Sequence, residues 1–455
     1  MVKDLTKGKV LPLLIRFAAP LVLSNIFQLT YNAVDGMIVG KFVGDEALAA
    51  VGICNPIMTL MILFLNGLCL GAGILMGVKY GAGDHEALKL QISTTMIAGV
   101  TFSLVLSLFC IVFAHPLLLL MQVNPSILEL TEEYLRVIFI GLTFTFLYNF
   151  FASTLRALGD SKTPLYFLMA SALLNVGGDL LFVIVFRLGS LGCAIATVIS
   201  EVLCCLFCFV YIYLRVPVLR LGKQWFAFDR KTLRATISYG WVSAMQQATV
   251  QLGKIGMQTI VNTMPVPVTA AFTAVNRVDD FAYAPEQNIG NAMTSVMAQN
   301  RGAGKKDRVQ EAFRYGMLIE VVYGVLVFLI FFFLAEPVMG LFVNAEEEPE
   351  VVEHGVRYLH CIAAMYVLPA ITNGLQGYFR GIGDLKVTLI SSFVNMGVRL
   401  VAAIPMVFVF HIGIEALPLS YLIGWIAMLL TEVPLLIKSQ KKKTSGYAPS
   451  TDDPS

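Results

Sequence analysis

Apolar runs long enough to cross a bilayer recur along the chain from one end to the other. A helix needs about 20 such residues for the crossing, and helices satisfy backbone groups where water is absent. The runs lack the two-residue alternation of outer-membrane barrel strands. The pattern predicts an all-α polytopic membrane protein with twelve helical spans, at residues 14–40, 47–78, 92–114, 134–157, 163–186, 190–214, 233–262, 267–298, 313–336, 356–380, 386–410 and 412–437.

Composition agrees with this prediction. Of the 455 residues 57% are hydrophobic and 14% are charged, and the mean hydropathy is +0.76, whereas an average soluble protein is about half apolar and a quarter charged. The net charge of +2 gives no basic field for a nucleic-acid partner. No P-loop motif occurs, so we expect no ATP hydrolysis and no need for an ATPase subunit. Cys204, Cys205 and Cys208 lack a second pair of ligands for zinc, so we expect the cysteines to be small apolar side chains inside the spans and not a metal site.

Lys and Arg concentrate at the two ends and in every second connection between spans. The positive-inside rule then places both termini in the cytoplasm of a multi-pass plasma-membrane protein. The predicted division is a cytoplasmic N-terminus at 1–13, a first lobe at 14–214, a basic linker at 215–232, a second lobe at 233–437 and a disordered tail at 438–455.

The two lobes are copies of one another. Gly81-Ala82-Gly83 recurs as Gly302-Ala303-Gly304, and Asn175 recurs as Asn395. Six spans separate the copies, which makes this a parallel repeat about an axis along the membrane normal, a plan used by transporters that alternate access by rocking two lobes. The repeat removes any need for a dimer, so we expect a monomer.

One repeated turn resembles an enzyme motif. Gly381-Ile382-Gly383-Asp384 has the G-x-G-D pattern of intramembrane aspartyl proteases, but Gly159-Asp160 stands at the matching place of the first lobe. A Gly-Asp pair repeated after a helix is typical of a helix cap and turn. We therefore expect no enzyme activity.

An ionisable side chain inside a span costs free energy, so each one is a candidate functional residue. The first lobe has Asp35 and Asp179, with Asn175 one turn before Asp179 and Thr197 in the next span. A buried carboxyl can load and unload a proton near neutral pH, and carboxylates with amide and hydroxyl oxygens can hold Na⁺. We predict a cation-coupling site of Asp35, Asp179, Asn175 and Thr197. For Na⁺ coupling, the metal ligands would be Asp35, Asp179 and Asn175. Helix capping or pairing with amides is the structural alternative.

Other polar or aromatic side chains within the spans are candidates for a substrate cavity. They are Gln28, Tyr31, Asn32, Tyr148, Gln251, Lys254, Glu286 and Arg399. The second-lobe charges nearly cancel, so a buried ion-pair network is the alternative there. Pro20 inside the first span permits a kink.

In this order the residues resemble the multidrug and toxic compound extrusion (MATE) family. The resemblance rests on Pro20, the stretch from Val34-Asp35-Gly36 to Ala50, the Gly-Ala-Gly turns, Asn175 with Asp179, and Gly192 to Thr197. It implies a V-shaped two-lobed transporter in which Pro20 is the hinge of the first helix. Asn175, Asp179 and Thr197 match the cation site of the DinF-like branch. Span 7 and span 10 lack the acids of the NorM-like branch, which favours a site in the first lobe.

We therefore expect a secondary active multidrug exporter that works by alternating access and antiport with H⁺ or Na⁺. Its partners would be membrane lipid and small amphipathic or cationic drugs, with no cofactor besides the coupling ion. The main alternative is a flippase for a lipid-linked precursor from the same superfamily, which would need a cavity rich in Arg and Lys for pyrophosphate. An ion channel would need a filter motif, and none is visible.

Overall fold

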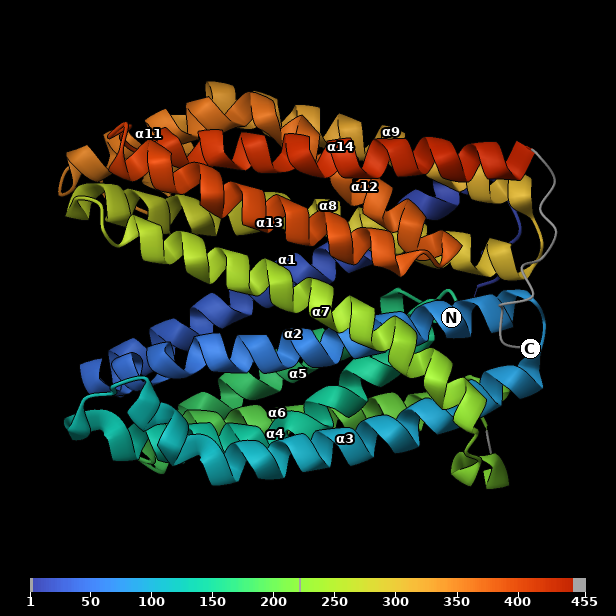
Figure 1. Cartoon of the computed structure of the whole chain (residues 1–455). Coiled ribbons are helices and arrows are strands. Elements are labelled where there is room, and N and C mark those ends of the chain that lie inside the picture. The colour runs from blue at the N-terminus through green and yellow to red at the C-terminus, as the bar shows by residue number, and fades with distance from the viewer. Residues whose placement is uncertain (1–2, 221, 445–455) are drawn as a thin grey trace. The chain divides into compact units, whose positions relative to one another are not determined.

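The computed structural model describes residues 3–220 and 222–444, without the side chains of Asn32, Asp35, Asp45, Lys223 and residues 442–444. The helices are α1 Val10–Phe42, α2 Asp45–Gly81, α3 His85–Leu120, α4 Pro125–Ala157, α5 Lys162–Leu180, α6 Gly189–Arg215, α7 Arg230–Val261, α8 Val266–Gly302, α9 Lys306–Phe333, α10 Ala335–Gly340, α11 Pro349–Ala363, α12 Val367–Ile382, α13 Leu385–Phe408 and α14 Ala416–Thr444 (Figure 1). A π-helix, η1 (Leu181–Val185), follows α5, and short 3₁₀ turns are η2 (Pro217–Leu219), η3 (Gly222–Phe226) and η4 (Ala364–Tyr366).

A helix lies at each of the twelve predicted spans, and the all-α prediction is confirmed. The tenth span is the pair α11 and α12, joined through η4. Within the described residues, ten helical segments are long and apolar enough to cross a membrane. The long helices α7 and α8 are not among them, because they carry the polar side chains that the sequence analysis singled out. At the end of the chain α14 continues to Thr444, so the start of the predicted tail is helical, and residues 445–455 lie outside the description.

By its contacts the chain divides into two compact units. The first unit comprises the described residues up to Leu5 together with Ala19–Ala244, and the second comprises Thr6–Ala18 and the described residues from Met245 on. The division passes through α1 close to Pro20 and through the middle of α7. The predicted linker at 215–232 and the first half of α7 therefore belong to the first unit.

Each unit has its own aromatic-rich core. In the first unit Phe139, Phe146 and Phe150 of α4 are almost completely buried among apolar side chains of α2, α3 and α6. In the second unit Phe272 of α8 and Trp425 of α14 are buried in the same way. Lipid does not drive helices together as water does, so close van der Waals packing of this kind is what holds them.

Glycine lets α2 and α7 approach closely within the first unit. A Cβ placed on Gly71 would lie 2.5 Å from the backbone nitrogen of Gly240, and one on Gly67 would lie 2.4 Å from Cα of Ala244. Any larger residue would force the two backbones apart. Small residues at four-residue spacing are the usual means of such contact in membranes.

The cysteines pack as small apolar side chains. All eight are free, and seven of them are buried, while Cys361 is half-buried. Their burial agrees with the predicted role as small apolar side chains, and Cys204 donates from its Sγ to the carbonyl of Phe167 at 3.4 Å.

The repeated Gly-Asp turns follow the predicted cap geometry. Gly159 and Gly383 have left-handed backbone, with φ of 85° and 88°. Asp160 then binds the start of α5: its Oδ1 accepts from the backbone N–H of Lys162 at 3.2 Å and of Thr163 at 3.1 Å, and its Oδ2 accepts from the Thr163 hydroxyl at 2.7 Å. The matching Asp384 makes no such side-chain cap on α13 and is exposed. Both acids thus sit at helix ends, as the turn interpretation requires.

Because Asp160 caps its helix and Asp384 does not, we expect an Asp→Ala substitution to destabilise the protein more at position 160 than at position 384. Asp160→Ala should lower the free energy of unfolding by about 1–2 kcal/mol, because two backbone N–H groups and a hydroxyl lose their acceptor. Asp384→Ala should change it by about 0.5 kcal/mol or less. Thermal unfolding of the two variants in nanodiscs measures both, and equal losses would contradict the assignment of the cap to Asp160.

Candidate cation and substrate sites

Three of the four predicted cation-coupling residues lie on the neighbouring helices α5 and α6 of the first unit. Asn175 of α5 donates from Nδ2 to Oγ1 of Thr197 on α6 at 3.2 Å, and the Thr197 hydroxyl donates to the carbonyl of Cys193 at 3.0 Å. Asp179 follows Asn175 by one helical turn and has a relative exposure of 0%. The structure thus joins Asn175 to Thr197 and places a fully buried carboxyl beside that link.

The backbone on either side of Asp179 has two unusual features, a close contact with α6 and a change of helix type. Gly178 permits close contact of the two helices, because a Cβ there would lie 3.0 Å from Cβ of Ala196 on α6. Directly after Leu180 the α-helix changes to the π-helix η1. Single π-turns inside helices occur often at functional sites, because the extra residue re-aims the side chains beside it.

The α1 residues of the predicted site are only partly described. Pro20 lies inside α1, but the side chains of Asp35 and Asn32 lie outside the described set. Among the described residues no group of three or more His, Cys, Asp or Glu gathers as a metal site. The hinge, the role of Asp35 and the sodium ligand set of Asp35, Asp179 and Asn175 therefore stay predictions.

The other first-unit candidates differ in their surroundings. Gln28 is exposed and Tyr31 is half-buried. Tyr148 donates from its hydroxyl to the carbonyl of Pro164 at 3.3 Å, which ties α4 to the first turn of α5. Tyr148 therefore has a packing role at the same place where it could line a cavity.

The candidate charges of the second unit have several kinds of partner among the described residues. Lys254 pairs with Asp280 at 3.1 Å, but both side chains are about half exposed, at 58% and 48%. Asp279 instead accepts from the hydroxyl of Tyr366, and Arg277 is exposed. The described charges of this unit are divided among different partners. Gln251 is half-buried nearby on α7.

The positive charge of Arg399 is stabilised by two aromatic rings. Its guanidinium carbon lies 3.7 Å from the ring centre of Tyr421 and 5.6 Å from that of Trp425, both on α14. The side chain is 6% exposed. The repeat places this cation where the first unit has Asp179, so the two halves carry opposite charge at the corresponding position.

Several acids inside the helices were missed by the sequence analysis. Glu201 of α6 accepts from the Thr145 hydroxyl of α4 at 2.8 Å. Glu320 of α9 and Glu432 of α14 have exposures of 0%, as does the predicted candidate Glu286 of α8. Each missed acid is a single Glu in an otherwise apolar run, which is the signal that would have found it.

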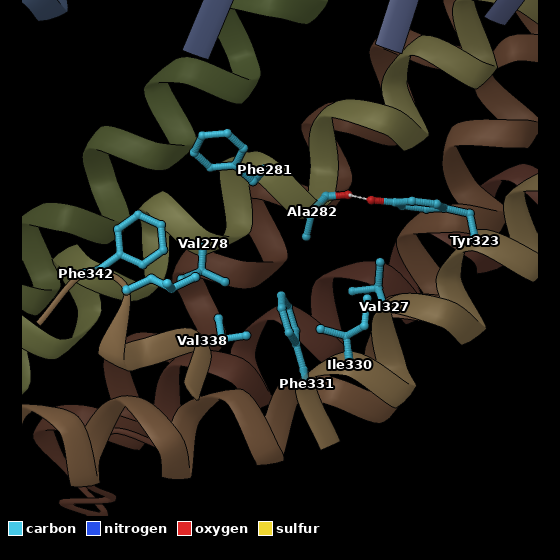
Figure 2. Close-up of a pocket in the computed structure, with 10 residues that line it drawn as sticks. Val278, Phe281, Ala282, Tyr323, Val327, Ile330, Phe331, Val338 and Phe342 are labelled. Atoms are coloured by element: carbon cyan, nitrogen blue, oxygen red, sulfur yellow. Dashed lines mark hydrogen bonds between the residues drawn. The ribbon is translucent and has the colours of Figure 1, made fainter. Parts of the chain in front are cut away.

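A largely apolar cavity of about 400 Å³ opens within the second unit, and the predicted candidates are not among the residues that line it (Figure 2). It is lined by Val278, Phe281, Ala282, Tyr323, Val327, Ile330, Phe331, Val338, Leu341 and Phe342. At one end the Tyr323 hydroxyl donates to the carbonyl of Ala282 at 3.0 Å. Its volume lies in the range of small-molecule pockets.

The sequence model of the MatE family matches the chain twice, over residues 20–181 and 243–404. The chain belongs to the MatE family. Members of this family are membrane transporters, so the chain is a transporter and not an enzyme, as the resemblance implied. The double match also agrees with the internal repeat. The DinF-like subgroup stays a prediction.

Relatives cover most of the chain. "Probable multidrug resistance protein YoeA" of Bacillus subtilis is 32% identical over 398 residues, which are 85% of each chain. "Probable multidrug resistance protein YpnP" of the same organism is 28% identical, over 87% of this chain and 88% of that protein. A solved outward-facing multidrug resistance MATE family transporter of the MOP superfamily has a TM-score of 0.90 at 21% identity, over 98% of both chains.

The stacking of Arg399 predicts a cost for removing it. Arg399→Leu should lower the free energy of unfolding of this MatE transporter by about 2 kcal/mol, because a desolvated cation–π contact is lost. The matched change Arg277→Leu, at an exposed position of α8, should alter it by about 0.5 kcal/mol or less. Thermal unfolding in nanodiscs compares them, and similar losses in both would show that the rings do not stabilise Arg399.

Proposed function

We propose that the chain is a secondary active multidrug exporter that moves amphipathic or cationic compounds out of the cell by antiport with H⁺ or Na⁺. Two relatives that each cover most of the chain carry multidrug resistance names. The proposed setting is the plasma membrane, with both termini in the cytoplasm as the Lys and Arg distribution indicates. Membrane lipid surrounds the protein, which works as a monomer.

The observation that carries the coupling is the fully buried Asp179 beside the Asn175–Thr197 hydrogen bond. A carboxyl in an apolar interior is far cheaper when it is protonated or when it holds a cation. Oxygens of Asn175 and Thr197 would assist a cation, and Asp35 of α1 would complete the set. This chemistry gives one site that can be loaded and unloaded by either ion.

In the proposed cycle the outward-facing protein loads the cation at Asp179 and Asp35. Neutralising these acids changes the packing of α1, with Pro20 as the bend, and the substrate is released outside. The cation then leaves to the cytoplasm. A charge moving through 100 mV supplies about 2.3 kcal/mol, and one pH unit adds about 1.4 kcal/mol. One or two cations therefore support a substrate ratio on the order of 10²–10³.

The test is ethidium transport in proteoliposomes, with a pH gradient and a Na⁺ gradient imposed separately. Asp179→Asn and Asp35→Asn should reduce gradient-driven transport to the level of protein-free liposomes, because an amide can neither bind a proton at neutral pH nor supply charge for Na⁺. Asp84→Asn is the matched control. Asp84 caps α3 by accepting from the backbone N–H of Ala87 at 2.9 Å, and Asn caps equally well.

Two outcomes would overturn the proposal in different ways. Wild-type rates in Asp179→Asn would show that coupling lies elsewhere. Folded wild-type protein that responds to neither gradient would reject antiport of drugs, and transport of a lipid-linked pyrophosphate would then favour the flippase.

A further inference from the structure

The connection between α6 and α7 exposes two phenylalanine rings at one end of the helices of the first unit (Figure 1). Phe226, the last residue of η3, has a relative exposure of 87%, and Phe228, two residues before α7, has one of 49%. The apolar surface continues along α7, where Ile237 and Trp241 are 55% and 53% exposed. Single exposed apolar residues are ordinary, but several along one segment mark an interaction surface.

Contacts with α3 and α6 hold this connection in place. The Ser93 hydroxyl of α3 lies 2.8 Å from the carbonyl oxygen of Trp225 and 2.6 Å from that of Ala227, the two neighbours of Phe226. The Trp225 ring also packs on Phe209 of α6, with ring centres 6.0 Å apart. The backbone on both sides of Phe226 is therefore fixed, while the Phe226 ring stays uncovered and is available to a partner.

Exposed arginines flank the two rings. Arg215 ends α6, Arg230 begins α7, and Arg234 follows one turn later. Within the part of the chain that the structure describes, none of these three side chains makes a hydrogen bond or an ion pair. Arg230 and Arg234 share one exposed face of α7 with Ile237 and Trp241, because the four residues follow helical spacing. That face begins with cations and becomes apolar further along the helix.

The acids beside this connection already have partners. Glu86 at the start of α3 pairs with Lys89 at 3.0 Å, and its Oε2 accepts from Nε2 of Gln224 at 2.6 Å. Asp229 caps α7, since its Oδ2 accepts from the backbone N–H of Thr232 at 2.7 Å. The arginines therefore keep their positive charge available, which suits an anionic partner.

The neighbouring helices place this connection at the edge of a membrane. Both α3 and α6 are long and apolar enough to cross one, and the connection starts where α6 ends and is held near the start of α3. Aromatic rings and arginines are typical of the membrane–water interface, and a guanidinium binds phosphate through two parallel hydrogen bonds. A layer of lipid headgroups accounts for the rings and the arginines together.

We propose that the connection, at residues 215–234, is a docking surface for anionic phospholipids. Phe226 inserts between the headgroups. The guanidiniums of Arg215, Arg230 and Arg234 bind the phosphates. Anionic lipid is preferred because phosphatidylglycerol keeps a net negative charge, whereas the choline of phosphatidylcholine offsets its phosphate. The surface goes beyond the proposed export function, and only its assignment to the cytoplasmic leaflet rests on the orientation proposed above.

Quenching of tryptophan fluorescence by brominated lipids tests the surface in the full chain. Phe226→Trp is placed in phosphatidylcholine nanodiscs with increasing fractions of brominated phosphatidylglycerol or, separately, brominated phosphatidylcholine. The signal of the three native tryptophans, measured in the parent chain, is subtracted. Half-maximal quenching should need about fivefold less of the anionic lipid, the factor expected from one cation at an anionic surface. Added salt should reduce this preference, because it screens the charges.

The arginines are tested in the same Phe226→Trp background. Replacing Arg215, Arg230 and Arg234 together by Gln should make the two brominated lipids quench at equal fractions. The matched control removes the same charge at three other exposed positions, with Lys162→Gln, Arg314→Gln and Lys386→Gln. It should keep the preference, since these cations lie outside the proposed surface.

The outcomes separate the parts of the proposal. A ring at position 226 that neither lipid quenches would overturn the docking surface and point to a protein partner. Equal quenching by both lipids with the arginines intact, or a preference that survives their replacement, would reject recognition of the anionic headgroup. Should the arginine variant fail to fold, the preference in Phe226→Trp and its loss in salt still decide. The measurement uses neither a gradient nor a drug, so its result and that of the transport assay are independent.

Discussion

Taking a charged side chain out of water is the cost on which the interior of this protein depends. A single buried carboxylate can cost more than an ordinary core contact contributes, so each buried acid needs a hydroxyl, a cation or a proton. The fully buried Glu432 accepts from the Ser391 hydroxyl. The half-buried Glu201 and Asp279 accept from the hydroxyls of Thr145 and Tyr366. The acids at helix ends avoid the cost differently, because Asp160 accepts from backbone N–H groups of α5. The distribution of partners therefore indicates which acids are structural and which can change their protonation.

The same constraint explains why the two halves of a duplicated chain differ in their chemistry. At the corresponding position the first unit has Asp179 and the second has Arg399, which is covered by Tyr421 and Trp425. The fully buried acids of the second unit lie instead on α8, α9 and α14, so the two copies of the fold do not carry their acids at corresponding positions.

Much of the fold could be predicted because it depends on hydropathy averaged over segments of about 20 residues. Length and hydropathy identify most of the helices, and the repeat identifies the Gly159 and Gly383 turns. Asn175 and Thr197 were predicted together, since spacing within one helix and its neighbour constrains both. The π-turn η1 and the break at η4 could not be predicted, because their apolar residues carry no local signal and tertiary packing decides them. Glu320 and Glu432 were missed because single acids in apolar runs barely change hydropathy. The partners of the second-unit charges could not be predicted, because pairing depends on side-chain direction, which composition does not contain.

The burial of the cysteines makes the chain suitable for measuring conformational change with thiol-reactive labels. All eight are free thiols, and only Cys361 is more than slightly accessible. Thiol-reactive spin labels and dyes modify exposed cysteines far faster than buried ones. Once Cys361 is replaced, the remaining native cysteines should therefore react only slowly with such labels. A pair of surface cysteines, one in each unit, would report the distance between the units through the whole cycle without disturbing the buried thiols that pack the helices.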